Sequence, residues 1–315
     1  MPRDHFNPDT CTAIGPDPSG SGLECTIEGT LYGYYPSLGA NAFFAAFFGL
    51  CLVLQLGLGI KYKTWTYMIA LGFGCLGELI GYIGRIMLHN DPFSELGFQI
   101  QICCLIICPA FISGGIYLTL KHIVLNFGEN WSRLRPAWYT YIFITGDIFS
   151  LVLQGAGGGI AATADNGSSG QDIGTNLMIA GVIFQVVILV IFAICIGEYS
   201  LRCYRHRAEL APESWELFNN TKFRLFSGSV FIAYICILVR CAYRIPELTG
   251  GWGSDLMRNE AEFIALEGVM IVLAVLVLTV CHPGIFFPAM CNTIGAKKRA
   301  KSLGEDSSNE MMDRA

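Results

Sequence analysis

Residues 146–161 read GDIFSLVLQGAGGGIA, an apolar stretch that nevertheless holds an aspartate, a glutamine and five glycines. At 3.6 residues per turn, Asp147 and Gln154 are nearly eclipsed, and Ser150 and Gly158 fall close to the same stripe. A charged aspartate at the bilayer centre costs about 2.5–3.5 kcal/mol, so this stripe should face protein or water and offer Asp147 a partner. The stretch therefore predicts a transmembrane helix with one narrow polar face, whose small residues let another helix approach closely.

The composition of the whole chain is that of an integral membrane protein. Of its 315 residues, 53% are hydrophobic and 14% are charged, whereas soluble domains carry about 25% charged residues. Seven windows approach the roughly 20 apolar residues that a helix needs to cross the hydrocarbon core: 38–60, 67–88, 98–120, 137–161, 176–198, 226–245 and 259–281. Because backbone groups in lipid must bond within their own segment, we expect an all-α bundle of seven transmembrane helices.

Charges outside these windows predict the orientation of the bundle. Segment 1–37 is acidic, whereas Lys61 and Lys63 directly follow the first window. Further cations gather in alternate loops and in the tail: Lys121, Arg133, Arg135, Arg202, Arg205, Arg207, Lys222, Arg224, Lys297, Lys298, Arg299 and Lys301. Because cytoplasmic loops are enriched in Lys and Arg, we expect an extracellular segment at 1–37, a membrane domain at 38–284 and a largely disordered cytoplasmic tail at 285–315.

A second polar stripe lies in GELIGYIGR, residues 77–85. Glu78 and Arg85 share one side of this helix but lie about 10 Å apart along its axis at 1.5 Å per residue. Each should therefore pair across the bundle, and Arg85 with Asp147 is the predicted ion pair. Two structural alternatives remain: a buried ion pair without a functional role, and a packing stripe with one hydrogen-bonded acid in the fourth helix.

The last two windows carry further charges near their outer ends. Arg240 and Arg244 are i,i+4 neighbours, and Glu267 lies at a depth similar to that of Arg240, its predicted partner. Glu260 and Glu262 lie closer to the surface. These groups either line a polar vestibule that opens outward or, for the two surface acids, form interfacial ion pairs.

Three features fall outside the windows. Cys11 and Cys25 share the predicted extracellular segment, where they either form one disulfide or stay free thiols. Asn166 begins an Asn-Gly-Ser sequon in a predicted outer loop, which makes it a candidate for N-glycosylation. The loop at 199–225 mixes charged and aromatic residues and offers a contact surface for a cytoplasmic partner.

Several chemistries lack the residues that they need. The windows contain no interior lysine for a retinal Schiff base and no paired histidines for haem, and no phosphate-binding loop of the form G-x-x-x-x-G-K-[ST] occurs. The histidines lack the spacing of zinc ligands. We therefore expect no enzyme activity, no metal, no cofactor and no nucleic-acid partner.

Six segments in order resemble one family, the fungal lipid-translocating exporters, also called RTA-like: GELIGYIGR at 77–85, CPAFISGGIYLTL at 108–120, GDIFSLVLQGAGGGIA at 146–161, GVIFQ at 181–185, RCAYRIPELTGGWG at 240–253 and HPG at 282–284. The family includes exporters of sphingoid long-chain bases and sterol-analogue resistance proteins. The sequence differs in the seventh window, where Glu267 stands in place of the aspartate that we would expect. The resemblance implies a seven-span plasma-membrane protein that moves amphipathic lipids or confers resistance to them.

The residues and the resemblance together favour a lipid exporter that does not itself use ATP. Its candidate substrate-binding residues are Glu78, Arg85, Asp147, Ser150, Gln154, Arg240 and Glu267. In this hypothesis the two acids Glu78 and Asp147 meet a cationic amino headgroup, and Arg85 sets their charge when the site is empty. The alternative is a seven-span receptor or lipid-stress sensor that acts on lipid tolerance indirectly.

Overall fold

The computed structural model describes residues 15–16, 24–27, 30, 32–127, 136–164, 169–206, 215, 218–250 and 254–287. Seven helices in this part are long and apolar enough to cross a membrane. They comprise α1 (Leu38–Tyr62), α2 (Trp65–Asn90), α3 (Glu95–Phe127), α4 (Pro136–Thr163), α5 (Ser169–Arg205), α7 (Thr221–Thr249) and a seventh span assembled from α8 (Glu260–Glu262), the π-helix η4 (Phe263–Val269), α9 (Met270–Val280) and α10 (Pro283–Phe286). Two-residue strands, β1 (Gly15–Pro16) and β2 (Glu24–Cys25), pair antiparallel near the N-terminus.

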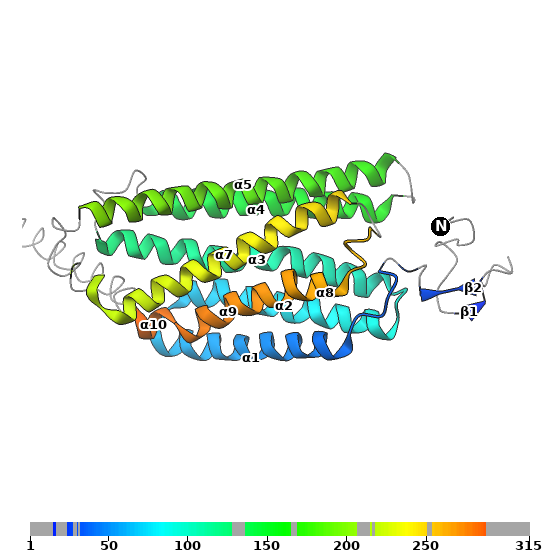
Figure 1. Cartoon of the computed structure of the whole chain (residues 1–315), viewed down its shortest axis with the longest axis horizontal. Coiled ribbons are helices and arrows are strands. Elements are labelled where there is room, and N and C mark those ends of the chain that lie inside the picture. The colour runs from blue at the N-terminus through cyan, green and yellow to red at the C-terminus, as the bar shows by residue number, and fades with distance from the viewer. Residues whose placement is uncertain are drawn as a thin grey trace, which may run out of the picture.

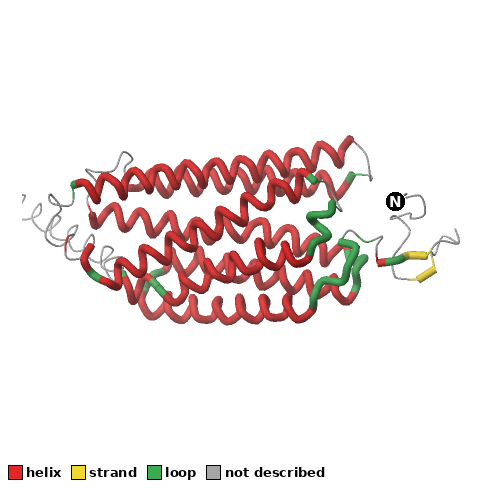
Figure 2. Tube along the Cα trace, viewed as in Figure 1, coloured by secondary structure: helices red, strands yellow, loops and turns green. Residues whose placement is uncertain are grey.

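The helices lie lengthwise beside one another (Figures 1 and 2), and their contacts close a ring in the order of the sequence. Each helix contacts the next from α1 to α5, α5 contacts α7, α7 contacts α9, and α9 returns to α1. Helix α3 also contacts α7 across this ring, and α7 runs diagonally over the bundle (Figure 1). Since α3 lies between its neighbours α2 and α4, polar residues on those two helices cannot be assumed to meet.

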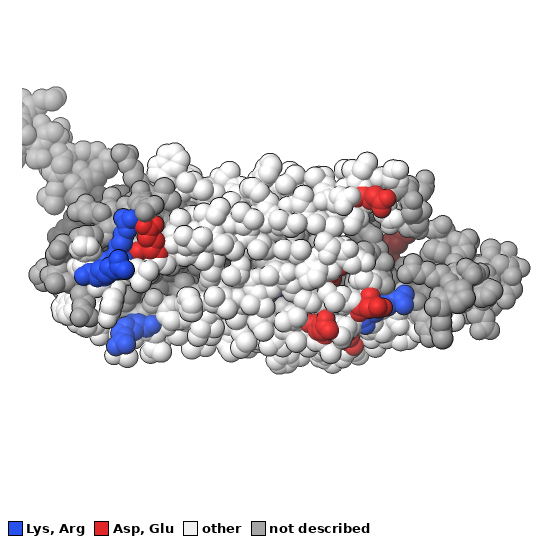
Figure 3. Space-filling model, turned by 45° about the horizontal axis from the view of Figure 1, so that its top comes forward, with Lys and Arg blue, Asp and Glu red and all other residues white. Residues whose placement is uncertain are grey.

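The prediction of seven membrane-length apolar helices is confirmed in the described part of the chain, and most helices are longer than the predicted windows. Helix α5 has 37 residues, which makes it about 56 Å long at 1.5 Å per residue, well beyond the roughly 30 Å of hydrocarbon. Lys and Arg gather at one end of the face in Figure 3, most acids lie towards the other end, and a broad uncharged belt separates them. The distribution suits a membrane-spanning bundle, and the predicted extracellular N-terminus remains a prediction.

Small residues set the distance between α4 and α5. A Cβ added at Gly157 would lie 2.6 Å from the carbonyl oxygen of Gly174, so the two backbones touch there. The predicted close approach is therefore present, but it occurs at Gly157, because a Cβ at Gly158 would be 3.7 Å from the nearest atom, the sulfur of Met178.

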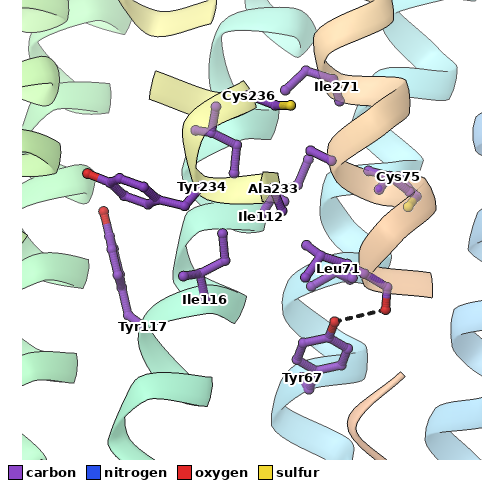
Figure 4. Packing of buried hydrophobic residues seen from close by; sticks show 14 of the residues in the cluster. Tyr67, Leu71, Cys75, Ile112, Ile116, Tyr117, Ala233, Tyr234, Cys236 and Ile271 are labelled. Carbon is purple, nitrogen blue, oxygen red and sulfur yellow. Dashed lines mark hydrogen bonds between the residues drawn. The ribbon is translucent and has the colours of Figure 1, made fainter. Parts of the chain in front are cut away.

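Aromatic side chains fill the centre of the bundle (Figure 4). The ring of Tyr117 packs against Phe143 and Phe192 at centroid distances of 5.6 and 4.3 Å. The phenol of Tyr67 donates a hydrogen bond of 3.2 Å to the carbonyl of Leu278 and so ties α2 to α9.

Cys11, Asn166, the tail from 288 and residues 207–214 and 216–217 of the predicted partner loop lie outside the described residues. The disulfide between Cys11 and Cys25, the glycosylation of Asn166 and the cytoplasmic partner therefore stay predictions.

Candidate functional site

Six charged side chains form a buried group between α2, α7 and η4, which we call the arginine–glutamate cluster: Glu78, Arg85, Arg240, Arg244, Glu247 and Glu267. It contains three arginines and three glutamates, and each is at most 7% exposed. The formal charges of the cluster therefore cancel. Ion pairs within 4 Å link all of them except Arg85, and buried charges are tolerated when they are paired.

Glu267 is the centre of this cluster. Its Oε1 accepts a hydrogen bond of 3.0 Å from Arg240 and a second bond from Arg244. Arg240 also lies 3.6 Å from Glu78 and donates to the carbonyl of Leu105 on α3 at 2.6 Å, while Arg244 pairs with Glu247 at 2.9 Å. The predicted pairing of Arg240 with Glu267 is confirmed.

The π-helix η4 carries Glu267. Such a segment is rare and often occurs at functional sites, because its wider turn changes which side chains face inward. The next residue, Gly268, lets η4 pack closely against α1 and α2. A Cβ at Gly268 would lie 2.6 Å from the ring of Phe44 on α1 and 3.2 Å from the Tyr82 hydroxyl on α2. The local backbone thus lets Glu267 reach both arginines.

Arg85 joins the cluster from its outer side. It donates a 2.7 Å hydrogen bond to the Tyr34 hydroxyl, and its guanidinium lies 3.6 Å from the centre of the Phe263 ring and 5.3 Å from that of Tyr32. Burial raises the pKa of both phenols above the ordinary value, because loss of water opposes the ionised form, and the nearby charge of Arg85 opposes this only in part. Both tyrosines therefore stay neutral.

Residues 32–37, which precede α1, cover the cluster, so the described residues form no open vestibule there. His89 meets the carbonyl of Pro36 at 2.8 Å, and the carboxylate of Glu260 accepts a 2.5 Å bond from the backbone of Ser37. Glu262 is half-buried and accepts from Asn259 at the start of α8. The prediction of an outward-opening vestibule is therefore wrong for this structure, and the two surface acids hold loops and helix ends instead.

Asp147 belongs to a different group, which we call the Asp147 site: Ser113, Tyr117 and Asp147. One carboxylate oxygen of Asp147 accepts a 2.7 Å hydrogen bond from Ser113 on α3. The other oxygen has no hydrogen-bond partner among the described residues, although the side chain is only 3% exposed. The Tyr117 phenol faces both groups without reaching hydrogen-bond geometry. Among the described residues, no cation pairs with Asp147.

The predicted ion pair between Arg85 and Asp147 is wrong. Arg85 is held by Tyr34, and Asp147 turns towards Ser113. The physical reason is the order of the helices in the ring. Helix α3 lies between α2 and α4, so the polar face of α4 contacts α3 and not α2. The polar residues predicted to form one pathway thus fall into two separate groups.

Ser150 and Gln154 occupy the same face of α4 but serve its packing. Ser150 donates to the backbone carbonyl of Asp147 at 2.7 Å, and Gln154 donates to Gln185 of α5 at 3.1 Å. Sequence reasoning overlooked Gln185, Ser113 and Tyr117 as partners of this face. All three lie in apolar windows as isolated polar residues, which is the signal that would have identified them.

No group of three or more histidine, cysteine, aspartate or glutamate side chains suited to a metal ion occurs among the described residues. Both polar groups are thus built from hydrogen bonds and ion pairs. Their chemistry is that of binding a polar or charged headgroup, or of holding helices together.

Comparison with known proteins identifies the family. Residues 71–290 match the family described as RTA1 like protein. Sphingoid long-chain base transporter RSB1 of Saccharomyces cerevisiae is 29% identical over 301 residues, which cover 84% of this chain and 76% of that protein.

Two further relatives from Saccharomyces cerevisiae are similar in extent. Protein RTM1 is 29% identical and covers 77% of this chain and 76% of its own, and protoporphyrin uptake protein 1 is 27% identical with 68% and 67% covered. No solved structure matches. Because the family match spans more than half of an integral membrane protein with seven apolar helices, the chain belongs to the RTA1-like family.

Proposed function

We propose that this protein moves amphipathic lipids with a cationic amino headgroup across the plasma membrane, with its N-terminus outside. A relative that covers most of the chain is named as a sphingoid long-chain base transporter. The observation that carries the proposal is the Asp147 carboxylate, which is buried and has no cation among the described residues. An ammonium group would complete it by a charge-assisted hydrogen bond.

The arginine–glutamate cluster suits this task less well. Glu267 already bonds two arginines, so a cationic headgroup would have to displace an existing partner there. Neither oxygen of Glu78 has a hydrogen-bond partner among the described residues, but Arg240 lies 3.6 Å away and its charge would repel a cationic headgroup. We therefore assign headgroup binding to Asp147 and a structural role to Glu78, Arg85, Arg240 and Glu267. The sequence has no phosphate-binding loop for ATP, so transport runs downhill or is driven by another component.

Reconstitution of the purified chain into liposomes tests the proposal. A labelled long-chain base placed in one leaflet should reach the other leaflet faster than in protein-free liposomes, and a diacyl lipid without an amine should not. Ser150→Ala is the matched control on α4, because the Ser150 hydroxyl donates to a backbone carbonyl of the same helix and not to the Asp147 carboxylate.

An absence of translocation would contradict the proposal. If ligand-dependent binding of a cytoplasmic protein to the 199–225 loop were found instead, the receptor or stress-sensor function would replace it. Translocation by the chain alone would exclude the purely indirect mechanism.

A further inference from the structure

An apolar cavity of 510 Å³ lies between α3, α5 and α7. Its lining includes Ile116 and Leu120 of α3, Gly197 and Cys203 of α5, and Phe231 and Tyr234 of α7. Its volume falls within the range of about 300–1,000 Å³ that is typical of small-molecule sites. Cys203 lies near the C-terminal end of α5, and Tyr234 lies near the middle of α7, so the cavity runs from the basic end of the bundle towards its centre.

The cavity is open sideways, between α5 and α7. Gly197 is exposed, and Phe231 is 64% exposed on the outer surface of the bundle. In a membrane-spanning protein, this surface faces lipid tails. A hydrocarbon chain can therefore enter the cavity directly from the bilayer.

The central end of the cavity adjoins the Asp147 site. Tyr117 follows the lining residue Ile116 on α3, and Figure 4 shows its hydroxyl pointing towards that of Tyr234. Tyr234 lines the cavity, donates to the carbonyl of Leu189 at 2.5 Å and is within electrostatic range of Asp147. The Tyr117 phenol lies next to the Asp147 carboxylate, and no cation pairs with that carboxylate among the described residues. A buried acid without a cation thus lies beside the end of an apolar chamber.

We propose that this cavity is the tail-binding chamber for a single-chain amphiphile whose ammonium group is held by Asp147, with Tyr117 and Tyr234 at the boundary between head and tail. The inference rests on the proposed function and assigns the alkyl chain of its substrate to a specific cavity in the bundle. An acid without a cation selects the charge of the headgroup, and the apolar walls select the chain.

Binding to the detergent-purified full chain tests this without any transport step. Octadecylamine should bind at least tenfold more tightly than octadecanol, and more tightly than dodecylamine. Gly197→Phe should reduce affinity for octadecylamine about tenfold, or roughly 1.4 kcal/mol, and should shrink the advantage of the longer chain. A Cβ at Gly197 meets nothing within 4 Å, so the added ring can fill the cavity.

Gly155→Phe is the matched control, because Gly155 also has open space around its Cβ position, lies on α4 and does not line the cavity. It should bind octadecylamine as the wild type does. Asp147→Asn should abolish the preference for the amine over the alcohol. Unchanged binding of octadecylamine by Gly197→Phe, or a preserved amine preference in Asp147→Asn, would overturn the inference.

A photoactivatable octadecylamine analogue gives a second measurement on the unaltered chain, independent of whether the variants fold. Crosslinks should fall on the cavity-lining parts of α5 and α7, and crosslinks confined to α1 and α2 would contradict the inference. Binding as expected without translocation would refute the proposed function and leave this site standing. Translocation that is indifferent to Gly197→Phe would refute the site and leave the function standing.

Discussion

The arginine–glutamate cluster and the Asp147 site are both buried among the transmembrane helices. They differ in charge compensation, because the cluster contains both arginines and glutamates and the Asp147 site contains an acid alone. In the cluster, Arg240 and Arg244 form ion pairs with three glutamates, Glu267 accepts from both arginines, and Arg85 adds the third positive charge without an ion pair among the described residues. At Asp147, the Ser113 hydroxyl donates to one carboxylate oxygen, and no cation pairs with the carboxylate among the described residues. A group that balances itself suits structure, whereas an unbalanced acid suits a ligand.

Burial alone therefore does not separate structural from functional charges in this protein. Glu78 and Asp147 are 0% and 3% exposed, but Glu78 has Arg240 at 3.6 Å, whereas no cation pairs with Asp147 among the described residues. The comparison predicts that changes in the cluster act on stability, and that changes at Asp147 act on transport.

Glu267→Gln should give the largest effect on stability. It leaves Arg240 and Arg244 without their shared carboxylate, and removing one partner of a buried ion pair costs about 3–5 kcal/mol. Chemical unfolding in detergent micelles measures this. Glu262→Gln is the control, since that acid is only half-buried and the glutamine oxygen can still accept from Asn259, and it should change stability by less than about 0.5 kcal/mol. Equal stability of the two variants would remove the structural role of the cluster.

Asp147→Asn should lower translocation of a long-chain amine about a hundredfold, or roughly 2.7 kcal/mol, with little change in the unfolding free energy. The asparagine oxygen can still accept from Ser113, and no ion pair is broken. Cells expressing the variant at the normal surface level should lose resistance to added sphingoid base. Wild-type resistance in that variant would contradict the headgroup role.

Tyr34→Phe should cost about 2 kcal/mol of stability, because a hydrogen bond to the charged Arg85 is lost. Because the pKa of Tyr34 is raised in the folded state, its contribution is fully present below the unfolded pKa of about 10 and declines as the pH rises towards the raised value. Unfolding measured from pH 7 upward should show wild type and variant converging only above that point. A constant difference at every pH would contradict this reading of Tyr34.

Gln154→Leu should have the smallest effect, about 1 kcal/mol, because it leaves the amide of Gln185 without its partner between α4 and α5. The double change of both glutamines to leucine should recover most of this loss, since no buried polar group then remains unpaired. Unfolding of the single and double variants provides the measurement. A full loss of translocation in the double variant would place this pair in the pathway.

The fold followed from the sequence because hydrophobic length is a local property. Each window alone is apolar enough to cross a membrane, and the continuous order of contacts from α1 to α5 reflects short connections. The pairing of Arg240 with Glu267 was also predictable, since their windows are neighbours and their depths agree.

The partners of Asp147 were not predictable in the same way. Its stripe was visible on the helical wheel, but the wheel cannot tell whether α2 or α3 faces it. Ser113 carried no charge to attract attention in its window, whereas Arg85 did. The π-helix around Glu267 was equally hidden, because nothing in FIALEGV distinguishes it from an ordinary α-helix.

The neutral cluster also has a consequence for biosynthesis. Arg240 follows Glu78 by 162 residues in the chain, which at about 5–20 residues per second is roughly 8–32 s of translation. Throughout that interval the second helix presents an acid whose arginine does not yet exist, and Glu267 comes later still. The charges of the core are thus balanced only after the last span has been synthesised. A chain that ends earlier keeps unpaired charges in its membrane helices, which quality control of membrane proteins can recognise.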